Sequence, residues 1–384
     1  MTTNAKKLKI GLVLDDGLDS LDGVQQYILA IGGWLSDQGH DVKYIVGETH
    51  RQDIANVISV SRNIKVKFNG NVGTMPLPTS NNKLKKLLDE ENFDVLHVQM
   101  PYSPFMSSKL INLAYKNTAI IGSFHIAPNS KTVYYSNKLL GLWLRSSLKK
   151  FDQFLCVSEA AREFAKNTFG INCAISPNVV DYDLFNNAKP IAKYQSNDSK
   201  TILFLGRLVP RKGCQILLDA IKLLSKDNKV PTFKLVICGK GFLETSLKNF
   251  VSTNNLDDVV EFVGFVSEED KPSYYASADI SVFPSSGGES FGIVLIEAMA
   301  SGKSAILAGD NAGYRSVLGS KPEMLFDPLD SVALAGALKE LLTNNSEREN
   351  YADWGENYVK TFDIKKVGPE ILDIYQNTLL KKHK

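Results

Sequence analysis

Hydrophobic and polar positions follow two recurring patterns along the first half of the chain. Short apolar runs, typical of buried strands, are each followed by a stretch with helical spacing. Strands that alternate with helices predict a parallel sheet covered by helices on both faces. The predicted strands are 9–14, 41–46, 94–98, 119–124 and 154–157, and the predicted helices include 23–36, 84–90 and one that begins at Ser158.

The same pattern restarts near residue 200, after the polar stretch 193–200. Because 384 residues exceed one ordinary domain, we predict two doubly wound α/β domains in series. We place the first at 1–193 and the second at 194–362, and we expect an amphipathic helix within 363–384 to pack back on the first domain. The strands predicted for the second domain are 202–205, 234–238, 259–263, 280–283 and 304–307.

Composition is that of a soluble globular protein, with 43% hydrophobic and 22% charged residues. The formal net charge is +2, but residues 95–150 hold seven basic side chains and no acidic one, so the remainder is net negative. A single basic region gives no sign of a nucleic-acid partner. No signal peptide or membrane-spanning run is predicted. We expect reduced core cysteines of a cytoplasmic protein, because no metal-binding spacing links Cys156, Cys173, Cys214 and Cys238.

The stretch 284–300 carries the strongest chemical signal. A strand ends at Pro284, a Ser/Gly turn follows, and then comes an apolar helix that only Glu297 interrupts. A helix apolar on all sides is buried, so its first N–H groups and its dipole favour an anion, most often phosphate. Because Glu289 and Glu297 can accept hydrogen bonds from hydroxyls, we interpret the stretch as a clamp for a sugar attached to a diphosphate. The simpler alternative is a buried turn and core helix capped by one carboxylate.

Other chemistry-bearing residues follow the predicted strands of the second domain. Ligands of doubly wound sheets bind beyond the carboxyl ends of the strands, so we expect these positions to converge on one anion-binding crevice. Taken singly, the cations are equally well explained as solvated charges. The positions are Gly206-Arg207, Gly239-Lys240-Gly241 and Gly264-Phe265, with Lys212 close behind in Pro210-Arg211-Lys212-Gly213.

Taken together, several motifs resemble a known family. They are Leu203-Phe204-Leu205-Gly206-Arg207, Pro210-Arg211-Lys212-Gly213 and 288–300, with Gly23-Val24-Gln25, Gly39-His40-Asp41-Val42, 93–98, Phe124-His125, Val157-Ser158-Glu159 and Pro177-Asn178 in the first half. With these motifs nearly the whole chain resembles glycosyltransferase family 4, whose GT-B architecture has two Rossmann-like domains facing a central cleft. Within that family it is most similar to the bacterial phosphatidyl-myo-inositol mannosyltransferases.

The resemblance implies a role for each matching residue. Arg207 and Lys212 would hold the donor diphosphate, Glu289 the sugar hydroxyls and Glu297 the nucleotide ribose. His125 would approach the donor sugar near the reacting carbon, although a lone histidine beside Phe124 and Ile126 is more often structural. The remaining donor-site residues implied are Gly23, which would let a loop close over the diphosphate, then Gly206, Gly239, Lys240, Gly241, and the amides of Ser290, Phe291 and Gly292.

The relatives are cytoplasmic-face enzymes that take mannose from GDP-mannose and retain the configuration of the sugar carbon. The resemblance therefore implies a nucleotide-sugar substrate, GDP-mannose before UDP-sugars, and no cofactor. It also implies metal independence, because the D-x-D-like Asp181-Tyr182-Asp183 occupies a structural position in this family. Since the chain contains no firm carboxylate nucleophile, we favour a same-face attack assisted by the leaving phosphate.

The acceptor is expected to be a membrane lipid such as phosphatidylinositol. Two positions differ from the relatives: Asp22-Gly23 stands where they carry Gly-Gly, and no cation follows Asn69-Gly70, where lipid-specific relatives place arginines. The alternatives are a soluble or polymeric acceptor, a non-catalytic sugar-nucleotide-binding module, and a sugar-nucleotide epimerase.

A candidate membrane-binding helix lies in residues 138–151. Its apolar positions recur at near-helical spacing beside basic residues, so we predict docking on an anionic bilayer at the inner face of the plasma membrane. A core-facing helix with a solvated basic face is the alternative. The apolar positions are Leu139, Leu140, Trp143, Leu144, Leu148 and Phe151; the cations are Arg145, Lys149 and Lys150, with Lys83, Lys85 and Lys86 on an earlier helix.

Overall fold

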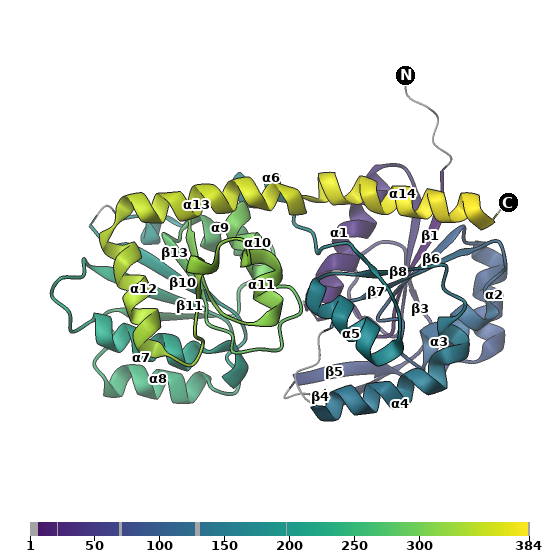
Figure 1. Ribbon diagram of the computed structural model, residues 1–384, viewed down its shortest axis with the longest axis horizontal. Coiled ribbons are helices and arrows are strands. Elements are labelled where there is room, and N and C mark those ends of the chain that lie inside the picture. The colour runs from purple at the N-terminus through teal and green to yellow at the C-terminus, as the bar shows by residue number, and fades with distance from the viewer. Residues whose placement is uncertain (1–6, 21, 69–70, 127–130, 197, 383–384) are drawn as a thin grey trace, which may run out of the picture. The chain divides into compact units, whose positions relative to one another are not determined.

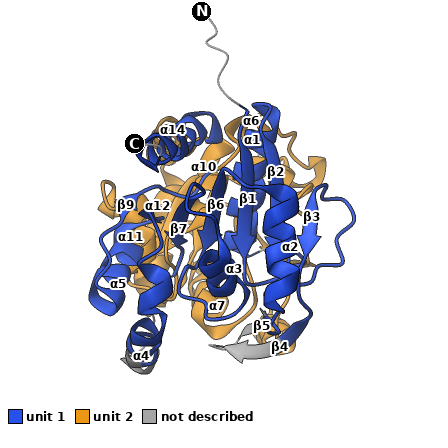
Figure 2. Cartoon of the chain, turned by 90° about the vertical axis from the view of Figure 1, so that its right-hand side faces the viewer, with its two compact units in different colours: residues 1–179, 364–384 blue, residues 180–363 orange. Residues whose placement is uncertain are grey.

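The structure, a computed structural model, describes residues 7–20, 22–68, 71–126, 131–196 and 198–382, so Asn69 and Gly70 lie outside the described residues. The chain forms two compact units (Figures 1 and 2). Unit 1 consists of residues 1–179 and 364–384, and unit 2 of residues 180–363. Each unit is a parallel sheet covered by helices, as the alternating pattern predicts.

Unit 1 has a seven-stranded sheet in the order β3-β2-β1-β6-β7-β8-β9, and its neighbouring strands are parallel. The order reverses between β1 and β6, which makes this pair the topological switch point. The strands are β1 (Lys9–Leu14), β2 (Asp41–Val46), β3 (Val57–Ser59), β6 (Val95–Gln99), β7 (Ala119–Phe124), β8 (Gln153–Cys156) and β9 (Ala174–Ile175). A separate antiparallel hairpin contains β4 (Asn63–Phe68) and β5 (Asn71–Pro76).

The helices of unit 1 bury their apolar faces in two core clusters. One cluster joins α1 to α14, where Gly368 lies so close to Trp34 that a Cβ atom would stand 2.5 Å from the indole ring. The other cluster includes side chains of α2, α3 and α4. The helices are α1 (Gly23–Asp37), α2 (Asn81–Glu91), α3 (Met106–Leu113), α4 (Lys131–Leu148), α5 (Glu159–Phe169) and α14 (Ile364–Lys382).

Unit 2 has a six-stranded parallel sheet in the order β12-β11-β10-β13-β14-β15, and its order reverses between β10 and β13. The strands are β10 (Lys200–Leu205), β11 (Phe233–Cys238), β12 (Val260–Gly264), β13 (Ile280–Phe283), β14 (Ala305–Gly309) and β15 (Leu325–Phe326). The helices are α6 (Tyr182–Asn186), α7 (Cys214–Leu224), α8 (Glu244–Thr253), α9 (Lys271–Ala276), α10 (Ile293–Ala300), α11 (Ala312–Leu318), α12 (Ser331–Thr343) and α13 (Asn345–Val359). Short 3₁₀ turns are η1 (Ala192–Tyr194), η2 (Pro210–Lys212), η3 (Pro322–Met324) and η4 (Lys360–Phe362).

The chain passes from unit 1 to unit 2 between Val179 and Val180, earlier than the boundary at 193 drawn from the polar stretch. Val180 N donates to Phe362 O at 3.0 Å, which joins the start of unit 2 to its end. Tyr194 is buried, and its hydroxyl donates to Glu261 at 3.0 Å. The polar stretch begins on a packed turn of unit 2, so polarity alone located the crossing wrongly.

The cysteines do not all remain thiols. Cys156 and Cys173 form a disulfide with a Cα–Cα distance of 5.7 Å, whereas Cys214 and Cys238 are free and buried. The expectation of four reduced core cysteines is therefore wrong for one pair, because β8 and β9 are neighbours and bring these side chains together. None of the helices built from the described residues combines the length and apolarity needed to span a bilayer.

Candidate functional site

The candidate site of unit 2 lies at the switch point of its sheet, where β10 and β13 end. The loop after β13 runs from Pro284 to Gly292, and Gly292 (φ +110°) immediately precedes α10. The turn η2 lies directly against this loop: a Cβ atom on Gly213 would stand 1.9 Å from Pro284 O. This close approach requires glycine at 213 and holds the two preceding cations, Arg211 and Lys212, against the loop.

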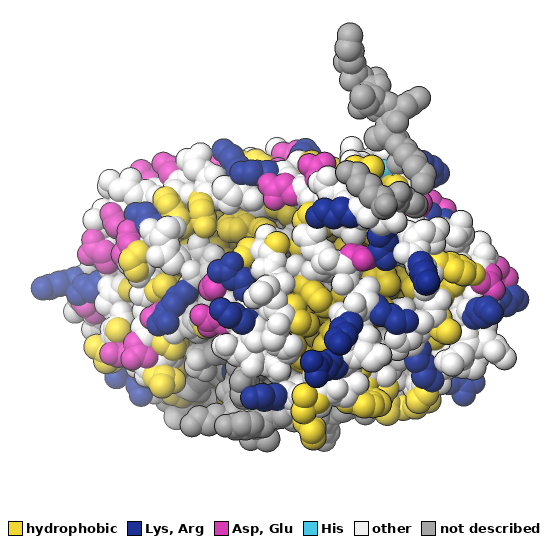
Figure 3. Space-filling model, turned by 45° about the vertical axis from the view of Figure 1, so that its right-hand side comes forward, with side chains coloured by type: hydrophobic (Ala, Val, Ile, Leu, Met, Phe, Trp, Pro, Cys, Tyr) yellow, Lys and Arg dark blue, Asp and Glu magenta, His cyan; other side chains and the backbone are white. Residues whose placement is uncertain are grey.

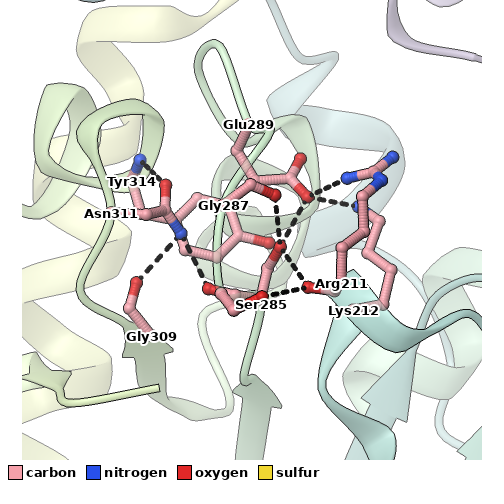
Figure 4. A network of polar contacts seen from close by, with 9 residues as sticks. Arg211, Lys212, Ser285, Gly287, Glu289, Gly309, Asn311 and Tyr314 are labelled. Carbon is pink, nitrogen blue, oxygen red and sulfur yellow. Dashed lines mark hydrogen bonds and ion pairs between the residues drawn. The ribbon is translucent and has the colours of Figure 1, made fainter. Parts of the chain in front are cut away.

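Glu289 is the centre of the site (Figure 4). Its Oε1 pairs with Arg211 Nη1 at 2.7 Å and Lys212 Nζ at 2.8 Å, and also accepts a hydrogen bond from Ser285 Oγ at 2.8 Å. Burial by itself raises the pKa of Glu289, but Lys212 and Arg211 outweigh it and hold the pKa below its usual range. The hydrogen bonds and the shortest ion pairs of Glu289 in the described part of the chain are all made through Oε1. The other oxygen, Oε2, can accept a hydrogen bond from a ligand hydroxyl.

The loop is fixed on both sides. On one side, Ser286 N donates to Arg211 O at 2.9 Å, and Ser285 Oγ lies 3.0 Å from the same oxygen. On the other side, Asn311 Nδ2 donates to Ser285 O at 3.0 Å, while its Oδ1 accepts from Tyr314 N and caps α11 (Figure 4). These bonds tie the carboxylate-bearing loop to η2 and to α11, so the site is preorganised without a ligand.

The glycine-containing turns predicted after β10 and β11 do lie against each other in unit 2. A Cβ atom on Gly239 would stand 1.9 Å from Gly206 O, and Gly206 N donates to Cys238 O at 2.9 Å. Leu208 N donates to Lys240 O at 3.0 Å, so the corner after β11 packs backbone against backbone on the corner after β10. Arg207 lies half-buried just beyond β10, and Lys240 is exposed.

Arg211 is a functional candidate to which the sequence analysis assigned no role. It stands inside the quoted Pro210-Arg211-Lys212-Gly213 motif, but only Lys212 was assigned to the site. The turn η2 directs both adjacent cations to Glu289. The sequence did contain a signal for Arg211: Glu289 was expected to lie inside the molecule, and a buried carboxylate needs cations as partners.

Glu297 is more enclosed than a ligand-binding role implies. It is 4% exposed on α10, and its two oxygens accept from Lys271 Nζ at 3.0 Å and Tyr275 Oη at 3.1 Å. Lys271 also pairs with Glu268 at 2.7 Å. Burial alone lowers the pKa of Lys271, but Glu297 and Glu268 more than compensate and raise it. Ribose binding by Glu297 stays a prediction, and the contacts show that this carboxylate holds α9 to α10.

In unit 1, His125 follows β7 directly and is buried. Its Nε2 lies 2.7 Å from Gln99 Oε1, and its ring meets Tyr27 edge-on with centroids 4.9 Å apart. Burial, and then His97, lower the pKa of His125 to about 3, so the ring is neutral at physiological pH. Gly23, the other predicted residue of this unit, begins α1 in an exposed position.

Two carboxylates stand at the end of β1 in unit 1. Asp15 is buried, and its Oδ1 accepts from Ser107 N at 2.8 Å. Asp16 accepts from Gln25 Nε2 at 3.2 Å and from Thr74 Oγ1. Burial raises the pKa of both groups above the usual value, against the effect of these hydrogen bonds. This edge of unit 1 therefore presents carboxylates where an anion-binding site would need cations.

The D-x-D-like Asp181-Tyr182-Asp183 forms the beginning of α6. Asp181 caps the helix by accepting from Leu184 N at 3.1 Å, and Tyr182 Oη donates to Glu356 at 2.7 Å. No cluster of three or more metal-ligating side chains occurs among the residues that the structure describes. The contacts give Asp181 and Tyr182 structural roles.

The helix α4 divides the predicted apolar stripe between two faces. Leu144 and Leu148 are buried, as is Phe151 beyond the helix, and Leu140 packs against the same core cluster. A single stripe is therefore wrong, because positions 140, 144 and 148 share the core face while 139, 142 and 143 share another. We call the second set the α4 patch: Leu139 (71% exposed), Leu142 (68%) and Trp143 (71%).

Exposed Lys138, Arg145 and Lys149 are also on this helix or just beyond it. On α2, Lys83 Nζ donates to Val60 O at 2.9 Å, and Lys86 pairs with Glu90 at 3.6 Å. The helix α4 thus carries exposed positive charge beside the α4 patch, and of the α2 lysines Lys86 has a carboxylate partner. Figure 3 shows one face of the molecule, on which Lys and Arg side chains stand among exposed hydrophobic ones.

Comparison with known proteins adds independent information. Residues 187–360 match the family described as "Glycosyl transferases group 1", and residues 21–184 match "Glycosyltransferase Family 4". The chain is 32% identical over 377 residues to the phosphatidyl-myo-inositol mannosyltransferase of Mycobacterium tuberculosis, covering 96% of this chain and 97% of that protein. Identity to the protein of the same name from Mycolicibacterium smegmatis is 31% over 374 residues, covering 96% and 94%.

Solved structures share the fold. A glycosyltransferase from Rickettsia africae superposes with a TM-score of 0.75 at 18% identity, covering 98% of this chain and 99% of that one. HepE of Anabaena in complex with UDP superposes with a TM-score of 0.72 at 16% identity, covering 96% and 100%. The predicted GT-B fold class is thereby confirmed.

Proposed function

Because the chain belongs to glycosyltransferase family 4, we propose that it moves a mannosyl group from GDP-mannose to a hydroxyl of a phosphatidylinositol-type membrane lipid. Binding of a nucleotide-sugar donor is supported by the cluster of Arg211, Lys212 and Glu289 beside the start of α10. The names of the relatives support mannose and the lipid.

The cluster suits a sugar attached to a diphosphate. Two cations and one carboxylate leave one net positive charge, and the uncompensated start of α10 adds to it. As the sugar–phosphate bond breaks, negative charge develops on the departing diphosphate and is stabilised by these groups, with Arg207 assigned to the same task. Glu289 Oε2 accepts a hydrogen bond from a sugar hydroxyl. An oriented donor of this kind lowers the activation free energy by roughly 3–4 kcal/mol.

The transfer is proposed to retain the configuration at the sugar carbon, by attack on the face from which the phosphate departs. Glu289 is already engaged by two cations through Oε1, which makes it a poor nucleophile and a good hydrogen-bond acceptor. An NMR spectrum of the product that shows inverted configuration, or a trapped covalent glycosyl-enzyme, would contradict this mechanism.

The donor assignment is tested by incubating the protein with radiolabelled GDP-mannose, GDP-glucose, UDP-glucose or UDP-galactose and vesicles containing phosphatidylinositol. We expect label in the lipid phase from GDP-mannose. Label from a UDP-sugar alone would change the donor assignment, and binding of a sugar nucleotide without turnover to any acceptor would support a non-catalytic binding module.

The α4 patch supports a lipid acceptor. Three exposed apolar side chains, one of them Trp143, share a helix with exposed Lys138, Arg145 and Lys149. An apolar surface with a basic surround suits the interface of an anionic bilayer, where each nearby cation contributes roughly 1 kcal/mol. We propose that this surface places the protein peripherally on the cytoplasmic face of the plasma membrane.

Sedimentation with vesicles of phosphatidylglycerol and phosphatidylcholine tests this docking. The wild type is expected to sediment at low salt and to be released as salt rises. Trp143→Ser should lower the bound fraction severalfold, whereas Leu329→Ser, at a residue 75% exposed in unit 2, should not. Lys83, Lys85 and Lys86 changed together to Gln test the contribution of α2. A wild type that stays in the supernatant at low salt would rule out the docking.

An uncharged acceptor is the second candidate, and the observation that favours it is the pair Asp15 and Asp16 at the end of β1. Carboxylates repel an inositol phosphate but accept hydrogen bonds from the hydroxyls of a neutral sugar or polysaccharide. Soluble oligosaccharides in the same transfer assay distinguish the two acceptor classes: label in the aqueous product and none in the lipid would favour the second.

A further inference from the structure

Gln99 lies next to the candidate catalytic histidine in the sheet of unit 1. It is the last residue of β6, and its register partner on β7 is Ser123, so it ends beside His125. Both side chains are buried, Gln99 at 1% and His125 at 4% exposure. The distance of 2.7 Å between Gln99 Oε1 and His125 Nε2 is that of a hydrogen bond.

A second contact decides which way the Gln99 amide points. Its nitrogen, Nε2, lies 3.5 Å from the backbone carbonyl of His97, a group that can only accept a hydrogen bond. The amide NH₂ therefore faces the carbonyl, and Oε1 faces the imidazole. Since Oε1 can only accept as well, the His125 ring must donate from Nε2. In the neutral ring this leaves the lone pair on Nδ1.

The surroundings keep the ring uncharged. Among the described residues, the titratable groups shown to interact with the ring are Tyr27 of α1, which it meets edge-on, and His97 of β6. Neither supplies negative charge, since burial raises the pKa of Tyr27 to about 12 and lowers that of His97 to about 3. Gln99 provides a neutral acceptor, so none of these described contacts compensates an imidazolium.

His97 is itself immobilised. Its Nδ1 lies 2.6 Å from Tyr375 Oη of α14, and its Nε2 lies 2.7 Å from Ser123 Oγ. The backbone carbonyl that orients Gln99 thus belongs to His97, whose two ring nitrogens both have hydrogen-bond partners. The chain of contacts runs from the C-terminal helix through His97 and Gln99 to His125.

We propose that Gln99 is a positioning residue that fixes His125 as the neutral Nε2–H tautomer, with Nδ1 as its hydrogen-bond acceptor. Such a ring accepts a hydrogen bond from a sugar hydroxyl and has no positive charge for a phosphate. His125 then orients the donor sugar, while the groups of unit 2 take up the charge of the diphosphate. The inference rests on the proposed function only where it assigns the sugar to His125.

The tautomer is measured directly by ¹⁵N NMR of the histidine rings in the wild-type protein. His125→Asn identifies the signal among the five histidines of the chain. We expect an Nε2–H ring that does not titrate between pH 6 and pH 8. An Nδ1–H ring, or an imidazolium in that range, would overturn the proposal whatever the transfer assay shows.

Two substitutions sharpen the test. In Gln99→Glu a carboxylate faces the ring, so the pKa of His125 should rise and the histidine signal should titrate at higher pH than in the wild type. Gln99→Leu removes the acceptor, so the Nδ1–H tautomer should appear and kcat should fall about tenfold, with KM for the nucleotide sugar nearly unchanged because unit 2 is intact.

Gln153→Leu, at the opposite end of the neighbouring strand β8, is the matched control and should leave tautomer and kcat unchanged. A Gln99→Leu variant that keeps the Nε2–H tautomer would contradict the positioning role. Absence of transfer by the wild type with every donor and acceptor would contradict the proposed function and leave the tautomer result standing.

Discussion

The two units share a fold but differ in the partners that they give to buried polar groups. In unit 1, the neutral side chains of Gln99, His97 and His125 are buried and hydrogen-bonded, while the carboxylates Asp15 and Asp16 at the end of β1 have hydrogen-bond donors as partners and no ion pair within the described part of the chain. Unit 2 buries carboxylates and compensates them with cations, Glu289 with Arg211 and Lys212, and Glu297 with Lys271. Buried charge is costly unless it is paired, and both buried carboxylates of this comparison in unit 2 have cationic partners. Under the proposed function, the cations of unit 2 would stabilise the leaving diphosphate, and the carboxylate of Glu289 and the neutral ring of His125 would each accept a hydrogen bond from the sugar.

The largest expected effect comes from breaking the buried pair of unit 2. Lys271→Met leaves Glu297 charged, buried and without its cation, which should cost roughly 3–5 kcal/mol of unfolding free energy. Urea denaturation measures the change. Combining it with Glu297→Gln, which keeps an acceptor for Tyr275, should recover much of the loss.

The control is Lys248→Met, which removes an exposed partner of Glu244 on α8 and should cost less than about 0.5 kcal/mol. Equal losses of unfolding free energy in the two lysine variants would contradict the prediction that the buried Lys271–Glu297 pair contributes more than an exposed pair.

The next effect separates charge from structure within the donor site. Lys212→Met should lower kcat roughly 100- to 1000-fold, because a cation facing the leaving diphosphate is lost. The variant should remain folded, since Arg211 still compensates Glu289. Transfer kinetics at saturating donor and a thermal melt provide the two measurements, with Lys248→Met again as control. Near wild-type turnover would refute the assignment of Lys212.

Acid should destabilise unit 1 before unit 2. The pKa values of His97 and His125 are lowered to about 3, below the ordinary 6.5, so the unfolded chain binds protons first as pH falls. The stability that these neutral rings provide is complete above about pH 6.5 and is lost progressively towards pH 3. At pH 5 each histidine accounts for about 2 kcal/mol of lost unfolding free energy. Asp15 and Asp16 offset part of this loss, because their raised pKa values favour proton binding by the folded unit.

Unit 2 contains no histidine, so it provides an internal control. Urea unfolding at pH 7.5 and pH 5 can be followed by Trp34 for unit 1 and Trp354 for unit 2, in single-tryptophan variants. Equal shifts of the two midpoints would contradict the prediction.

The smallest expected effect is that of chelation. Because Arg211 and Lys212 provide fixed positive charge, we predict that transfer survives EDTA. Asp181→Asn tests the same point inside the chain, because asparagine caps a helix as well as aspartate but is a weaker metal ligand. Loss of activity in EDTA that magnesium or manganese restores would show that the site depends on a metal.

Much of the fold follows from local pattern. The predicted limits of β1, β2, β7 and β13 agree residue for residue with the structure, because each is an apolar run bounded by polar or turn residues. The approach of Lys212 to Glu289 was also foreseeable, since both follow strands that meet at the switch point. Periodicity and strand order are properties of short segments, and the sequence expresses them directly.

Burial and partnership are decided only by the tertiary structure. Apolar residues on α4 look alike in sequence, yet packing covers Leu144 and exposes Trp143. Arg211 becomes part of the site because η2 turns it towards Glu289, and Cys156 meets Cys173 because β8 and β9 are neighbours. The sequence determined which segments form strands and helices and where ligand-binding edges arise. The tertiary structure decided the partners of each polar group, since a contact such as that of His97 with Tyr375 joins residues 278 positions apart and no local pattern encodes it.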